Sequence, residues 1–176
     1  ITGGEVSAGA SYDFGNGFTT AVGLQTATAG VLTEESRDSY AFNAAYTGES
    51  YGVSVTVAFG ENATLTDDDG AAAFNAYYTP DGLPSISVGY EIGEQGGVPS
   101  ATDEFESFFI GLTWDEVGPG SAGIAAGHST TVEGSDEEYM YEAYYEYPVN
   151  DGMTITPLVF VQDSSTDGVD DTTGVM

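Results

Sequence analysis

Carboxylates are the side chains of this sequence that could do chemistry, because they greatly outnumber every other ionisable group. Twenty-nine aspartates and glutamates stand against a single basic residue, Arg37, and a single histidine, which gives a formal net charge of -28. Ionised carboxylates without a basic partner cost far more in an apolar interior than packing can return. We therefore expect the strand glutamates Glu91, Glu142 and Glu146 to face water and to attract cations.

The same counts exclude several kinds of function. The chain has no cysteine, so neither disulfides nor thiolate chemistry are available to it. No basic patch can neutralise phosphates, which argues against nucleic acid as a partner. With one histidine, no set of nucleophile, base and acid can be identified, and we predict that the protein is not an enzyme.

Two signals for a metal ion are present, and we interpret neither as a dedicated site. His128 could join Glu133 or Asp136, but a lone histidine at a strand end is more simply explained as solvated. The acidic runs 67–70 and 167–171 offer oxygen ligands for calcium without the spacing of an EF-hand loop. We predict no metal and no cofactor, and we expect Arg37 either to pair with a loop acid or to line a pore.

Strands must position these residues, because apolar side chains alternate with small or polar ones along the whole chain. Ten segments of about eight to twelve residues carry this alternation, and an eleventh begins at the end. They span residues 5–13, 18–26, 38–47, 51–60, 70–79, 85–94, 104–115, 122–129, 137–147 and 153–162, with 173–176 as the start of another. No segment has a helical pattern, and no apolar run is long enough for a membrane-spanning helix.

Connections of two kinds alternate strictly between these segments. Compact turns, several with Asn-Gly or Asp-Gly, occupy residues 14–17, 48–50, 80–84, 117–120 and 148–152. Longer, hydrophilic connections occupy residues 27–37, 61–69, 95–103, 130–136 and 163–172. A phrase that closes a strand before a turn recurs at about 32 to 34 residues, as NAAYT at 43–47, NAYYT at 75–79 and, two periods later, EAYY at 142–145. This rhythm predicts an antiparallel meander of hairpins, with short turns on one rim and long loops on the other.

The two faces of this meander differ in chemistry. In segment 51–60 one face carries Tyr51, Val53, Val55, Val57 and Phe59, and the other carries small and polar residues. In segment 137–147 a row of tyrosines opposes Glu138, Glu142 and Glu146. We interpret the glycines of the polar face, such as Gly52 and Gly89, as bends. A soluble β-sandwich would bury the apolar face, whereas a membrane barrel would turn it to lipid around an aqueous lumen, and the pattern alone permits both.

Aromatic residues and strand length favour the membrane barrel. Aromatic rings that could form a girdle at a membrane interface lie at strand ends beside the short turns, namely Tyr46, Tyr51, Tyr78, Trp114, Tyr145 and Tyr147. Strands of about ten residues can cross a bilayer when tilted, whereas globular strands average about five or six. We therefore predict an all-β fold, an antiparallel up-and-down transmembrane β-barrel. We expect a partial barrel of about ten strands, a single domain over residues 1–176 that is truncated at both ends.

Three stretches carry a resemblance to a known family. They are residues 84–91 (PSISVGYE), 109–115 with 118–127 (FIGLTWD and GPGSAGIAAG), and 144–157 (YYEYPVNDGMTITP). They resemble the C-terminal part of cyanobacterial outer-membrane porins, which belong with the OprB-like carbohydrate-selective porins. The last stretch is the most specific, and the first half of the chain matches only in rhythm. The resemblance implies a trimeric pore in the outer membrane, with a signal peptide, a cell-wall-binding region and a coiled-coil spacer upstream.

These observations predict an outer-membrane porin, a water-filled channel for passive diffusion of ions and small hydrophilic solutes. Its pore-lining candidates are Glu91, Glu142, Glu146 and Arg37. Its expected partners are outer-membrane lipid, small ions and solutes, and further copies of itself in a homotrimer. The carboxylate excess implies cation preference, and carbohydrate transport follows only from the family name. The alternative is a soluble secreted or cell-surface acidic β-sandwich with an adhesive or structural role.

Overall fold

The computed structural model describes residues 6–26, 38–61, 69–94, 96, 104–132, 136–165 and 169–176, and the regular elements in these ranges are all strands. They are β1 (Val6–Asp13), β2 (Phe18–Thr26), β3 (Asp38–Thr47), β4 (Tyr51–Gly60), β5 (Asp69–Tyr78), β6 (Ser85–Glu94), β7 (Glu104–Val117), β8 (Gly120–Val132), β9 (Tyr139–Asn150), β10 (Met153–Ile155), β11 (Leu158–Gln162) and β12 (Thr172–Val175). None of the residues described forms a helix that is long and apolar enough to cross a membrane.

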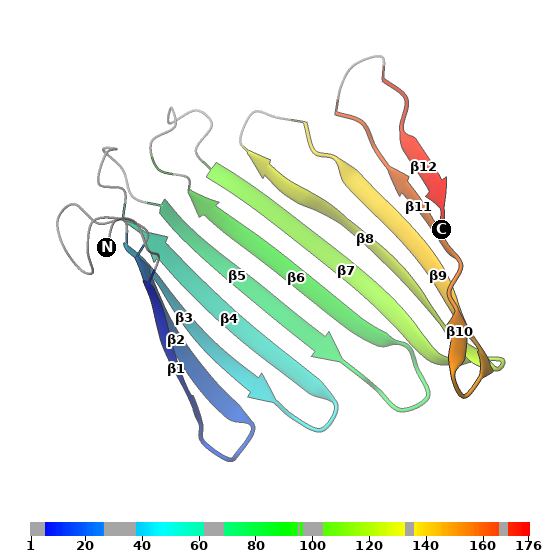
Figure 1. Ribbon diagram of the computed structural model, residues 1–176, viewed down its shortest axis with the longest axis horizontal. Coiled ribbons are helices and arrows are strands. Elements are labelled where there is room, and N and C mark those ends of the chain that lie inside the picture. Colours follow the sequence, from blue (N-terminus) through cyan, green and yellow to red (C-terminus); the bar gives the residue numbers. More distant parts are fainter. Residues whose placement is uncertain are drawn as a thin grey trace.

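The strands form one antiparallel sheet that follows the order of the sequence. The order is β1 to β9, then β11 and β12, and β10 also pairs with β9. Figure 1 shows the hairpin turns along one rim of the sheet and the strand ends that flank the longer connections along the opposite rim. The predicted meander and the predicted separation of turns from loops are therefore confirmed. The sheet is open, because β1 and β12 form its two edges and do not pair with each other.

The predicted tenth strand, 153–162, is interrupted near Pro157. Both of its parts pair with β9, with Ile155 opposite Tyr147 and Leu158 opposite Tyr144, so the register continues unchanged across the break. Proline has no N–H for the ladder, but the Pro157 carbonyl still accepts a hydrogen bond from Tyr145 N at 3.1 Å. The break divides the predicted tenth strand into two, and the predicted start of an eleventh strand forms β12, which pairs with β11. The described sheet therefore has 12 strands.

Glycines shape the short turns as the Asn-Gly and Asp-Gly pairs predict. Gly17 and Gly82 adopt φ values of 84° and 71°, which are accessible to glycine without strain. The first turn is also held by side chains, because Asn16 Oδ1 accepts a hydrogen bond from Phe18 N at 3.1 Å. These turns set the registers that carry each face across the sheet.

The apolar face of the sheet has no second layer against it in the described part of the chain. No apolar side chain there is buried, and Val53 and Val55 remain 41% and 47% exposed. A dry core between two sheets is the arrangement that a soluble sandwich requires. The described strands instead form a single sheet with both faces open.

Candidate functional site: the polar face of the sheet

The registers trace one polar face across the sheet. Directly opposite residues of an antiparallel pair point to the same face, so Ser54 shares its face with Asn75, and Asn75 with Gly89. Glu91 lies two residues along β6 from Gly89 and therefore belongs to this face. Continued through β7 and β8, the registers place Glu142, opposite Ala125, on the same face, and Glu146 follows four residues later.

The three glutamates share this polar face without forming a cluster. Two strands, β7 and β8, lie between Glu91 on β6 and Glu142 on β9, which separates their backbones by about 14 Å across the sheet. The registers also align Glu142 with Ser87, four residues from Glu91, which adds about 13 Å along the strands. Glu142 and Glu146 are about 13 Å apart along β9. The arrangement is a dispersed negative field and not a binding site with convergent ligands. The fourth pore-lining candidate, Arg37, lies outside the described residues.

Neutral hydrogen-bonding groups fill much of the polar face between the acids. Asn43 Nδ2 donates to Thr56 Oγ1 at 2.8 Å, and the two residues lie directly opposite each other on β3 and β4. Ser107 Oγ donates to Glu91 Oε2 at 3.5 Å between β7 and β6, where the two residues lie directly opposite each other. Glu91 and Ser107 line a shallow hollow of about 390 Å³ together with Asn75. Such a surface can hold water and hydrated ions.

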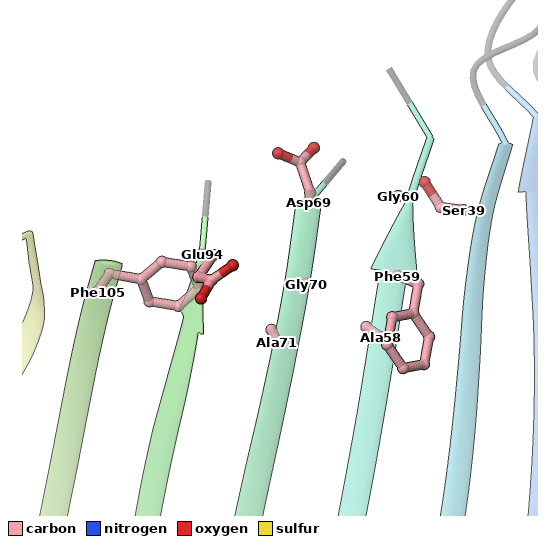
Figure 2. A pocket seen from close by; sticks show the side chains of 9 residues that line it. All are labelled: Ser39, Ala58, Phe59, Gly60, Asp69, Gly70, Ala71, Glu94 and Phe105. Atoms are coloured by element: carbon pink, nitrogen blue, oxygen red, sulfur yellow. The ribbon is translucent and has the colours of Figure 1, made fainter. Parts of the chain in front are cut away.

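A second hollow lies near the long-loop end of β3 to β7. Its volume is about 280 Å³, and its lining includes the carboxylates Asp69 and Glu94 with the ring of Phe105. Figure 2 shows the Phe105 ring reaching from β7 towards β6, beside Glu94, and the Asp69 carboxylate at the end of β5. Asp69 Oδ1 accepts a hydrogen bond from Gly96 N, which ties this acid to the rim. Asp69 shares its face with Asn75 and therefore adds a carboxylate at the rim of the polar face.

Aromatic rings on the polar face lie over glycines of the neighbouring strand. Each of five rings covers the glycine directly opposite: Tyr77 over Gly52, Phe109 over Gly89, Phe105 over Gly93, Tyr144 over Gly123 and Phe160 over Gly174. A Cβ on Gly52 or Gly89 would lie only 2.3 Å or 2.4 Å from a ring atom. The space that the opposite ring requires therefore explains why these two residues are glycine. This steric reason replaces their interpretation as bends.

The predicted girdle residues all lie on the apolar face at the short-turn end of the sheet. Tyr51 is opposite Tyr78, Tyr46 is opposite Val53, and Trp114 connects through Ala122 to Tyr145, with Tyr147 two residues further along β9. Ring centroids of Tyr46 and Tyr51 are 5.5 Å apart, and Tyr145 Oη donates to Val117 O at 2.8 Å. We call these six residues the aromatic band.

His128 is buried, and the prediction of a solvated strand end is wrong. Only 6% of its surface is exposed, because the rings of Phe108 and Tyr139 meet it edge to face at centroid distances of 4.8 Å and 5.6 Å. Among the described residues, the acids that approach it are Glu106 and Glu137 and not Asp136. Glu133, the other acid considered for a metal, lies outside the described residues. Glu106 reaches His128 only through the pairing of β7 with β8, so sequence proximity could not reveal it.

Glu138 lies at the long-loop rim, since β9 begins one residue later at Tyr139. Its Oε1 accepts a hydrogen bond from Ser165 Oγ at 2.6 Å. This hydrogen bond stabilises the ionised form and lowers the pKa of Glu138 below its ordinary value. The acidic runs 67–70 and 167–171, considered above for calcium, lie partly outside the described residues.

A scan against protein-family models and searches of curated proteins and of solved structures found no match to this chain. The porin resemblance of residues 84–157 therefore remains a prediction, and the function rests on the geometry of the two faces.

Proposed function

We propose that this chain is part of an outer-membrane porin, a β-barrel around a water-filled channel that passes ions and small hydrophilic solutes and prefers cations. The observation that carries the proposal is the contrast between the two faces of one long-stranded sheet. The apolar face leaves Val53 and Val55 open and ends in the aromatic band, whereas the polar face carries Glu91, Glu142 and Glu146. Lipid on one side and water on the other satisfy both faces.

The dimensions of the strands support the same proposal. β3 to β6 each contain ten residues and β7 contains 14, which is long enough to cross a bilayer when tilted. Backbone N–H and C=O groups at a sheet edge cannot stay unpaired in lipid. The proposal therefore requires β1 and β12 to pair with further strands or with each other. A homotrimer in the outer membrane is the assembly that we propose for the complete pore.

Cation preference follows from how the acids are distributed. Glu91, Glu142 and Glu146 lie about 13 Å or more from one another, so they act on a passing ion through a shared negative field. A dispersed field raises the local concentration of cations without holding any one of them tightly. Such a lining suits diffusion better than capture.

The test is the reversal potential of the full-length protein in a planar bilayer under a salt gradient. The double change Glu142→Gln and Glu146→Gln should reduce cation preference, and more clearly at low salt, where screening is weak. The matched control is Glu116→Gln with Asp151→Asn, which removes the same charge at the short-turn rim.

Two outcomes would contradict the proposal. Equal loss of selectivity in both double variants would show that the polar face does not line the pathway. No conductance at all, with a protein that stays soluble without detergent, would favour the adhesive or structural surface protein.

A further inference from the structure

Glu106, His128 and Glu137 form a cluster at the long-loop end of the apolar face, far from the aromatic band. Glu106 belongs to β7, His128 to β8, and Glu137 precedes β9. One potential ligand atom from each residue lies within 4.8 Å of the other two. We infer that this cluster, the rim site, binds a divalent transition-metal ion such as zinc. The inference does not depend on the porin proposal.

A break in the strand register lies beside the rim site. Phe108 is opposite His128, but Glu106 is opposite Thr131, so β8 carries an additional residue between these two pairs. Ile92, opposite Glu106, shows that Glu106 points to the apolar face. A bulge at this place redirects side chains next to a site, as bulges in sheets frequently do.

A hydrogen bond from one ring nitrogen of the histidine orients the ring and leaves Nε2 as the nitrogen that would bind a metal. His128 Nδ1 lies 2.9 Å from the carbonyl oxygen of Ser129. A carbonyl can only accept a hydrogen bond, so Nδ1 carries the hydrogen, and the lone pair of neutral imidazole is on Nε2. Metal-binding histidines typically donate their other ring N–H in this way, which orients the ring and sets the tautomer. The edge contacts from Phe108 and Tyr139 restrict the ring further.

Each carboxylate of the rim site also has an outer hydrogen bond. Tyr90 Oη donates to Glu106 Oε2 at 2.8 Å, and Tyr139 Oη donates to Glu137 Oε2. Carboxylates that bind metals are commonly oriented by such second partners. The two carboxylates are close to each other at the rim of a mostly apolar face, and the whole sequence contains one arginine and no lysine. A bound divalent cation would remove the repulsion between them.

The ligand types select the kind of ion. One imidazole nitrogen with two carboxylates suits zinc and related ions, whereas calcium and magnesium prefer oxygen alone. Zinc bonds of about 2.0–2.2 Å would bring the three ligand atoms to about 3.4 Å from one another. Glu137 is exposed and Glu106 is half-buried, so both can move inward. Three protein ligands leave one position for water or an outside donor.

The test measures zinc binding to the full-length protein by calorimetry and follows the ring signals of His128 by NMR. This residue is the only histidine among residues 1–176, and comparison with the His128→Gln variant identifies its signals in the full-length protein. We expect one zinc ion to bind, to shift the His128 signals, and to stay bound in excess calcium. Glu137→Gln should weaken binding at least tenfold, and Tyr90→Phe, which removes an outer hydrogen bond, by about tenfold.

Glu142→Gln is the matched control, because it removes one carboxylate from the opposite face. His128→Gln should abolish binding, and the exposed Glu137 keeps the test interpretable if replacement of the buried histidine disturbs folding. Zinc that leaves the His128 signals unmoved would overturn the inference. The same conclusion would follow if Glu142→Gln weakened binding as much as Glu137→Gln, because zinc would then respond only to the general acidity of the chain.

Discussion

The two faces of the sheet use large side chains in different ways. On the apolar face large residues stand side by side, as Phe74 does between Val55 and Tyr90, and they remain exposed. On the polar face each of five rings lies opposite a glycine and covers the neighbouring strand. One face therefore presents apolar surface outward, and the other keeps its rings close to the backbone between acids and amides.

A positive charge placed on each face in turn should give the largest difference in stability between the two faces. Val55→Lys puts an ammonium group on the proposed lipid face and should lower the free energy of unfolding by about 2–4 kcal/mol in a bilayer. Ser54→Lys, one residue away on the polar face, should change it little. Urea unfolding of the full-length protein in lipid vesicles measures both. Equal losses would mean that the two faces meet the same surroundings.

Methyl groups added to glycines should distinguish covered from open positions on the polar face. Gly89→Ala places a Cβ 2.4 Å from Phe109 and should destabilise by about 1–3 kcal/mol through overpacking. Gly23→Ala meets no atom within 4 Å and should have little effect. Denaturant midpoints of the two variants give the comparison. Similar losses at both positions would show that the Phe109 ring is not the reason for glycine at position 89, and would favour the interpretation of Gly89 as a bend.

A smaller effect should appear within the aromatic band. Tyr145→Phe removes the hydrogen bond to Val117 O and should cost about 0.5–1.5 kcal/mol. Tyr147→Phe is the control on the same strand and face, since its hydroxyl has no hydrogen bond to another described residue. Thermal or denaturant unfolding measures the difference. A larger loss from Tyr147→Phe would point to a hydroxyl partner outside the chain, such as a lipid headgroup.

The smallest effect concerns an acid at the rim, outside both faces. Ser165→Ala should return the lowered pKa of Glu138 towards its ordinary value, which an NMR titration of the carboxyl carbon measures. Because the folded pKa is the lower one, the hydrogen bond stabilises the fold above the unfolded pKa and ceases to do so as pH falls through the folded pKa. An unchanged titration would show that Ser165 does not hold this carboxylate in solution.

Some features of this protein could be predicted because neighbours in sequence decide them. Alternation along a strand assigns Val53 and Val55 to one face and Ser54 to the other, whatever the strand pairs with. Asn16-Gly17 marks a tight turn by the backbone freedom of glycine. The polar placement of Glu142 and Glu146 follows from the same alternation.

Other features required the registers between strands. Gly89 lies opposite Phe109 and Gly123 lies opposite Tyr144, and no local pattern relates residues about 20 positions apart. His128 is buried by Phe108 from β7 and Tyr139 from β9. The residues next to His128 in the sequence do not indicate these contacts, so its place at a strand end predicts a solvated side chain. The break near Pro157 also divides a strand that alternation alone extends without interruption.

Residue type and short spacing are enough to predict an all-β meander, its two unlike faces, its alternating turns and loops and its strongly acidic character. The pairing between strands fixes which ring covers which glycine and which acids meet His128, so these contacts emerge only in the folded protein. The rim site illustrates the division, since Glu106 and Glu137 are two among 29 acids in the sequence and become distinct only where β7, β8 and β9 lie side by side.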